Sequence, residues 1–311
     1  ERVSFRQALA SLVRLGRPLF LVGGFIFFGL GTAIACYEGY DLGAHLWLWG
    51  QVAVTAAQLM THFANDYFDL DADRANRTPT YWSGGSRVLV ETALAPRWAL
   101  YMALVLLAVA LAATAQASRS AGAPAIAVLL AAVILSWFYS APPLRLHSRG
   151  VGELTVALVV PVLTTLAGYT LQTGRIGRAP LLAALPLAFF QFAMLLAIEF
   201  PDAEGDALAG KRTLVVRLGA EACIRLWRLA LALGLLALPL LPAAGLPGRA
   251  ALAPAVFALP LLAWFWRRLR QGAWRQRRWW DWLAFFSIAL LVGAALVELV
   301  AFLSLCLAAG R

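Results

Sequence analysis

The apolar stretch PLFLVGGFIFFGLGTAIAC, residues 18–36, decides the fold class of this chain. It carries no charge over about the 20 residues that a helix needs to cross a bilayer. Arginines within residues 2–17 precede it, a pattern that also begins signal peptides, and residues 33–36 faintly resemble a lipoprotein cleavage site. We interpret the stretch as a first transmembrane helix, because it is long enough to span and further apolar runs follow it.

The composition of the whole chain supports this interpretation. Its 311 residues are 62% hydrophobic and only 14% charged, with a mean hydropathy of +0.76, which excludes ordinary soluble domains. We therefore predict an all-α integral membrane protein with nine spans. The predicted spans are 18–37, 44–65, 98–117, 123–141, 151–172, 180–200, 225–246, 250–266 and 281–308.

The charged residues predict how the spans are oriented. If successive connections alternate between faces, the N-terminus shares one face with residues 66–97, 142–150, 201–228 and 267–280. All but five of the 26 basic residues then belong to that face, which the positive-inside rule makes cytoplasmic. The five on the other face are Arg119, Arg175, Arg178, Arg249 and Arg311.

Half of the 16 acidic residues cluster at the ends of two predicted spans on the cytoplasmic face. They are Asp66, Asp69, Asp71, Asp73, Glu199, Asp202, Glu204 and Asp206. The i, i+3, i+7 spacing of Asp66, Asp69 and Asp73 places them on one face of a helix if the helix continues, and Asp202 and Asp206 are spaced i, i+4. Asp71 and Glu204 fall off these faces and are equally compatible with a solvated loop.

Carboxylates at the end of an apolar helix are costly unless cations compensate them. Because no His or Cys belongs to either cluster, the oxygen ligands favour magnesium, manganese or calcium over zinc or copper. Magnesium is usually held by one or two carboxylates together with substrate phosphates, so two clusters suggest two ions that clamp a diphosphate. Lys211 and Arg212 follow Asp206 closely and could bind phosphate oxygens.

Four stretches of the chain, at 65–73, 139–146, 150–154 and 202–214, resemble motifs of the UbiA superfamily of intramembrane aromatic prenyltransferases. Asn65-Asp66-x-x-Asp69-x-x-x-Asp73 resembles the first aspartate-rich motif of the family. Asp202-x-x-x-Asp206, followed by Ala-Gly-Lys-Arg-Thr-Leu at 209–214, resembles the second. The segments 139–146, YSAPPLRL, and 150–154, GVGEL, resemble the sequence between the fourth and fifth helices of the family. The resemblance covers nearly the whole chain, 1–311, which we expect to form a single intramembrane domain.

The resemblance implies nine helices around a central cavity, with helical cap regions at about 66–97 and 201–224. It implies a magnesium diphosphate site in which Asp66, Asp69, Asp202 and Asp206 are catalytic. The implied metal ligands are Asn65, Asp66, Asp69, Asp73, Asp202 and Asp206. The basic residues expected near the diphosphate are Lys211, Arg145, Arg212 and Arg17, although Arg17 is equally compatible with an anchor at the membrane interface. Tyr139 matches a tyrosine that lines the reaction chamber.

The implied activity is magnesium-dependent transfer of a polyprenyl group from its diphosphate to an aromatic acceptor. The residues 83–87 and 209–213 are most similar to the dihydroxynaphthoate prenyltransferases of menaquinone synthesis. In that branch, paired asparagines and an arginine usually precede the second aspartate motif, whereas this chain has Ile198-Glu199-Phe200-Pro201. Hydroxybenzoate and homogentisate therefore stay open as acceptors. We expect a bacterial inner membrane location with a cytoplasmic site, lipid as the environment, and no nucleic-acid partner.

Two other functional classes of membrane protein agree less well with the sequence. A membrane transporter would place ionisable residues near mid-membrane, where the predicted spans carry almost none apart from Glu298. A CDP-alcohol phosphotransferase also uses aspartates and magnesium, but its Asp-Gly-x-x-Ala-Arg signature is absent from the sequence.

Two smaller features of the sequence each allow two interpretations. The residues Ser83-Gly84-Gly85-Ser86-Arg87 could present backbone amides to an anion or form a flexible turn in the cap. His62 could be an acid-base group, although a lone histidine at a helix end more often packs or forms a hydrogen bond.

Overall fold

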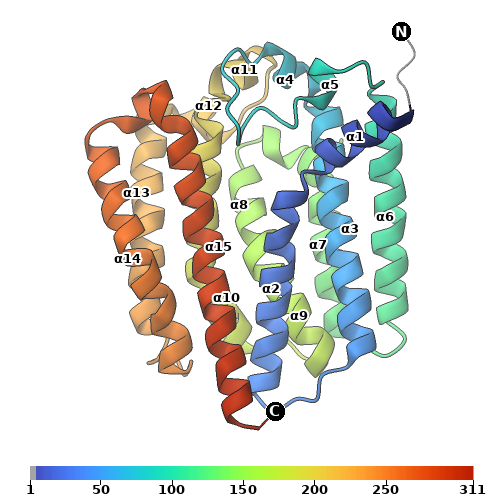
Figure 1. Cartoon of the computed structure of the whole chain (residues 1–311), viewed down its shortest axis with the longest axis vertical. Helices are drawn as coiled ribbons and strands as arrows, with labels where there is room; N and C mark the ends of the chain where they lie inside the picture. The colour runs from blue at the N-terminus through green and yellow to red at the C-terminus, as the bar shows by residue number, and fades with distance from the viewer. Residues whose placement is uncertain (1–4, 311) are drawn as a thin grey trace.

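The computed structural model describes residues 5–310, which form helices and connecting turns without a strand in that range. Long helices form a bundle, and short helices gather at one end of it (Figure 1). The bundle consists of α2 (Pro18–Tyr37), α3 (Ala44–Phe68), α6 (Arg97–Ala117), α7 (Ala123–Ser140), α8 (Gly152–Ala157), η2 (Leu158–Leu163), α9 (Thr164–Thr173), α10 (Arg178–Glu199), α13 (Ala220–Ala237), α14 (Gly248–Arg270) and α15 (Arg277–Ala308). Arg2 and Arg311, which enter the predicted charge distribution, lie outside the described residues.

The apolar helices confirm an all-α membrane fold. Among residues 5–310, eight segments are long and apolar enough to span a bilayer, with α8, η2 and α9 together forming one of them. The predicted span 44–65 corresponds to α3, which is 25 residues long but carries Gln51, Gln58 and Asp66 and is not among the eight. The count of nine crossings therefore stays a prediction.

One predicted boundary is displaced. The span expected at 225–246 is observed as α13, which begins at Ala220 and ends at Ala237, followed by the single turn η3 (Leu238–Leu240). Pro239 and Pro242 explain the early end, because proline has no backbone N–H to donate and clashes with the preceding turn.

Small residues allow α2 and α9 to pack closely. A Cβ on Gly31 of α2 would overlap the carbonyl oxygen of Thr165, and a Cβ on Gly168 of α9 would overlap that of Phe28. Close backbone approach through glycine is typical of helices that pack within a membrane. The contact fixes the position of α2, which carries one side of the central cavity.

The short helices form a cap over one end of the bundle. They are α1 (Phe5–Gly16), α4 (Leu70–Ala75), α5 (Val88–Glu91), α11 (Ala203–Leu208) and α12 (Leu214–Leu218), and they lie at the top of Figure 1. The predicted cap regions 66–97 and 201–224 contain four of them, while the second region also includes the start of α13. The cap brings the two aspartate motifs to the same end of the molecule.

Candidate active site

The first aspartate motif lies at the junction of α3 and α4. The helix is interrupted at Asp69, but the backbone N–H of Asp69 donates to the Asn65 carbonyl (2.8 Å) and that of Asp73 donates to the Asp69 carbonyl (2.9 Å). The helical repeat therefore continues across the junction. Asp66, Asp69 and Asp73 are buried on one side, whereas the Asp71 side chain is 93% exposed. Of the acids in this run, Asp71 belongs to the solvated surface.

Asp66 is held by groups from two other segments. Arg17, in the left-handed conformation (φ 47°) between α1 and α2, forms an ion pair with it. The backbone N–H of Ser86 donates to Asp66 Oδ2 at 3.2 Å, and the Ser86 hydroxyl contacts the same oxygen. The predicted basic residue Arg17 thus lies at the first motif.

Asp69 contacts three side chains. Lys211 Nζ lies 2.8 Å from Asp69 Oδ2, Asn65 Nδ2 donates to the same oxygen at 2.8 Å, and the buried His147 pairs with Oδ1. Burial alone would raise the pKa of Asp69, but Lys211 and His147 hold it well below its usual value. Asp69 is therefore an ionised carboxylate at the centre of the site.

The second aspartate motif meets the first across the cap. Asp202 accepts hydrogen bonds from Asn76 Nδ2 (2.7 Å) and from the backbone N–H of Gly84 (2.9 Å). Gly205 of α11 packs directly on the backbone of Asn76, since a Cβ there would lie 2.7 Å from the Asn76 Cα. Only glycine allows this approach, which joins the two halves of the cap.

Lys211 connects the two aspartate clusters. Its Nζ lies 2.8 Å from Asp69 of the first cluster and 3.4 Å from Asp206 of the second. Burial would lower the pKa of Lys211, but these two carboxylates hold it well above its usual value. Lys211, the residue predicted to bind the diphosphate, is therefore positively charged and lies between the two aspartate clusters.

The carboxylates outnumber the cations that face them. Burial, together with the charges of Asp66 and Asp69, raises the pKa of Asp73 to about 8. Burial also raises the pKa of Asp206 to about 7, even with Lys211 beside it. These shifts mark negative charge that the protein does not neutralise by itself and that a divalent cation would stabilise.

The residues fit magnesium better than a transition metal. In the described part of the chain, no three His, Cys, Asp or Glu side chains gather around one metal-sized point. Magnesium does not require such a cage, because it keeps waters and uses one or two carboxylates with substrate phosphates. The residues able to hold ions in this way are Asn65, Asp66, Asp69, Asp73, Asp202 and Asp206.

The other predicted basic residues lie at the rim. Arg145 is exposed, and its guanidinium donates to the carbonyl of Phe68 at 3.4 Å, directly beside Asp69. Arg212 is exposed, and its backbone N–H donates to the Ser148 carbonyl at 3.2 Å. Their roles in diphosphate binding stay predictions.

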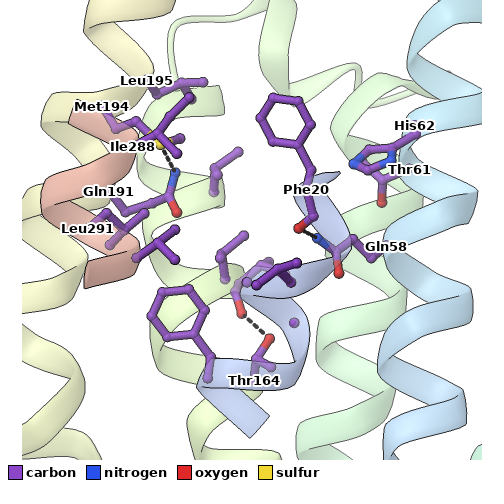
Figure 2. A pocket seen from close by; sticks show the side chains of 18 of the residues that line it. Phe20, Gln58, Thr61, His62, Thr164, Gln191, Met194, Leu195, Ile288 and Leu291 are labelled. Carbon is purple, nitrogen blue, oxygen red and sulfur yellow. Dashed lines mark hydrogen bonds between the residues drawn. The ribbon is translucent and has the colours of Figure 1, made fainter. Parts of the chain in front are cut away.

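An apolar chamber of about 610 Å³ lies beneath the aspartates. Its walls come from α2, α3, α7, α10 and α15 and from the segment that comprises α8, η2 and α9. Arg17, Asn65, Trp82 and Tyr139 line it, and because Arg17 and Asn65 also contact Asp66 and Asp69, the chamber adjoins the first aspartate motif. Figure 2 shows its interior, where side chains from α2, α3 and α10 face one another. The predicted chamber position of Tyr139 agrees with this geometry.

Several partners of the aspartates were not predicted. His147, Asn76 and Ser86 contact Asp69, Asp202 and Asp66 in turn. No helical spacing relates these three residues to the aspartates in the sequence. For the segment 83–87, which contains Ser86, the sequence predicts only that its backbone amides could face an anion. Its amides do approach anions, but these anions are the carboxylates of the site itself.

Two further groups complete the site. Glu153 of the predicted 150–154 motif accepts a hydrogen bond from the backbone N–H of Leu214 at 2.6 Å, which fastens the segment that carries Lys211. His62 forms the expected hydrogen bond, in which its Nδ1 lies 2.7 Å from the carbonyl oxygen of Gly16.

Comparison with known proteins places this geometry in context. Residues 21–291 match the model of the UbiA prenyltransferase family. A 1,4-dihydroxy-2-naphthoate octaprenyltransferase of Bacillus subtilis (strain 168) is 25% identical over 221 residues, which are 69% of this chain and 68% of that protein. UbiA prenyltransferase domain-containing protein 1 of Xenopus tropicalis is 27% identical over 231 residues, covering 74% of this chain and 66% of that protein.

Solved structures share the fold at low sequence identity. A UbiA homologue from Archaeoglobus fulgidus bound to DMAPP and Mg2+ superposes with a TM-score of 0.62 at 18% identity, over 94% of this chain and 99% of that one. The apo structure of a UbiA homologue from Aeropyrum pernix K1 gives 0.68 at 14% identity, over 92% and 97%.

Proposed function

This chain belongs to the UbiA prenyltransferase family and is a prenyltransferase, and we propose that it transfers a polyprenyl group from its diphosphate to an aromatic acceptor with Mg2+. The observation that carries this proposal is the arrangement of two largely buried aspartate clusters close to one end of an apolar chamber of about 610 Å³. The A. fulgidus homologue binds DMAPP and Mg2+, which supports the same class of donor here. Two ions are proposed, because each cluster offers separate carboxylates.

The chemistry follows from the arrangement of charge. Bound magnesium would neutralise diphosphate oxygens and so favour their departure. Asp66, Asp69 and Asp73 would hold one side of the ion site, and Asp202 and Asp206 the other. Lys211, already ionised between the clusters, would bind phosphate oxygens directly.

The transfer itself takes place in the chamber. The bond between the diphosphate oxygen and the allylic carbon breaks, and the leaving oxygen keeps the electron pair. The electron-rich ring attacks the allylic carbon to form a carbon–carbon bond, and then releases a proton or carbon dioxide. The allylic carbon gains carbocation character as its bond to oxygen breaks. The apolar walls exclude the water that would otherwise react with this carbon. Tyr139 lies on the chamber wall, where its phenol would face the substrates.

We propose 1,4-dihydroxy-2-naphthoate as the acceptor, which places the protein in menaquinone biosynthesis. The B. subtilis relative supports this choice, while 4-hydroxybenzoate and homogentisate are the alternatives. The basic residues on the cap side support a cytoplasmic location for the N-terminus and active site, in a bacterial inner membrane.

The test is product formation by purified protein with Mg2+, a panel of prenyl diphosphates and the three aromatic acids, analysed by mass. Asp66→Ala and Asp202→Ala should abolish transfer. Asp71→Ala is the matched control, because its exposed side chain lies in the same cap and its loss should leave transfer intact. Full activity of either cluster variant would reject the assignment, and solute flux in vesicles without covalent product would indicate a transporter instead.

A further inference from the structure

Gln191 is a buried amide in the chamber wall whose hydrogen bonds are largely unmade. It lies within α10, is 2% exposed and lines the chamber. Its Nε2 contacts the sulfur of Met194 at 3.9 Å, which is a weak interaction. Within residues 5–310, no group donates a hydrogen bond to its Oε1. An unpaired buried amide costs about 1–3 kcal/mol, and because Gln191 lines the chamber, a polar ligand bound there would be able to pair with it.

The facing wall offers a complementary group. His62 of α3 also lines the chamber, and its Nδ1 lies 2.7 Å from the Gly16 carbonyl. A carbonyl oxygen can only accept, so Nδ1 carries the proton and the neutral ring keeps a lone pair on Nε2. Figure 2 shows His62 and Gln191 on opposite sides of the chamber.

The groups near Gln191 are apolar. Met194, Leu195, Ile288 and Leu291 surround that side of the chamber (Figure 2). Such walls suit the flat faces of a ring and a prenyl tail, but they cannot satisfy ring hydroxyls. Polar lining residues elsewhere in the chamber include Gln58 and Thr61, which lie with His62 on α3, and Ser136 of α7. Among the lining residues that α10 contributes, Gln191 is the polar one.

We propose that Gln191 and His62 form the acceptor subsite and select an aromatic ring with hydroxyl groups on opposite edges. One hydroxyl donates to His62 Nε2, and the other pairs with the Gln191 amide. The inference rests on the proposed function and deepens it, because it assigns recognition of the acceptor to residues outside the aspartate motifs.

The test separates acceptor recognition from donor recognition. Gln191→Met preserves the length of the side chain and removes the amide. It should raise the KM for 1,4-dihydroxy-2-naphthoate about tenfold and leave the KM for geranyl diphosphate unchanged. His62→Phe should show the same split. The wild-type protein should prefer 1,4-dihydroxy-2-naphthoate to 1-hydroxy-2-naphthoate about tenfold, and Gln191→Met should lose that preference.

Gln51→Met is the matched control. Gln51 is a buried amide (4% exposed) of α3 whose Nε2 donates to Thr55 and whose Oε1 has no partner within residues 5–310, but it does not line the chamber. Its replacement should leave both KM values unchanged. Acceptor-specific effects of equal size in this variant would overturn the proposal, since they would reflect general disturbance of the bundle.

A binding measurement keeps the subsite testable apart from catalysis. The Kd of 1,4-dihydroxy-2-naphthoate is measured for the wild type and Gln191→Met in lipid nanodiscs. A weaker Kd in the variant supports the subsite even if no prenyl group is transferred, in which case only the proposed function fails. Equal Kd values, or no binding to the wild type, overturn the subsite.

Discussion

Lys211→Met removes the ammonium group that joins the two aspartate clusters and keeps most of the side-chain volume. The wild-type Nζ lies 2.8 Å from Asp69 and 3.4 Å from Asp206, and both carboxylates are buried. Removing one partner of a buried ion pair costs about 3–5 kcal/mol. The Lys211 side chain is 18% exposed, so we expect the lower end of that range.

The assay is thermal unfolding of the purified protein with EDTA or with Mg2+. Without metal, about 3 kcal/mol should lower the apparent Tm of the variant by roughly 5–10 °C. Mg2+ should stabilise the variant more than the wild type, because the ion replaces the missing charge. Its kcat/KM for prenyl diphosphate should fall about 10²- to 10³-fold, as for loss of one charge-stabilising group. An unchanged Tm in EDTA, or an unchanged kcat/KM, would refute the reasoning.

Two further predictions concern protons and packing. The pKa values of Asp73 and Asp206, raised from 3.8 to about 8 and about 7, favour the folded metal-free protein at low pH, and this contribution is lost progressively as the pH rises from about 4 to about 8. Mg2+ should therefore bind more tightly at pH 8.5 than at pH 6, which isothermal titration measures; affinity that is flat across this range would contradict the assignment. Gly31→Ala should lower the apparent Tm, because its Cβ would overlap the Thr165 carbonyl, whereas Gly248→Ala, with open space around it, should not; equal effects in the two variants would show that the close contact is unimportant.

The helical bundle could be predicted largely from apolar runs, because each run must satisfy its backbone within the membrane. Where prediction missed, local chemistry explains the difference. Pro239 and Pro242 end α13 early, although the surrounding residues remain apolar. Because of its polar residues, α3 is not among the eight segments that are apolar enough to span a bilayer.

The aspartates of the site could be predicted from spacing, since the helical repeat continues through Asp69 into α4. Their partners could not. His147 lies in the short helix η1 (Leu146–Ser148) and Asn76 directly follows α4, and only tertiary structure brings them to Asp69 and Asp202. Exposure also depends on the folded cap, which leaves Lys211 partly buried but the adjacent Arg212 at the surface.

The loop that contains Gly84 and Ser86 has a consequence for how the two clusters respond to ligands. Gly84 donates to Asp202 and Ser86 donates to Asp66, so one short peptide is bonded to both clusters at once. An ion that draws Asp66 away from Ser86 releases one end of the peptide and lowers the free energy needed to free Asp202 at the other. We therefore expect occupancy of the two clusters to be coupled through this loop, so that the cap would order around a complete donor complex rather than around either half of it.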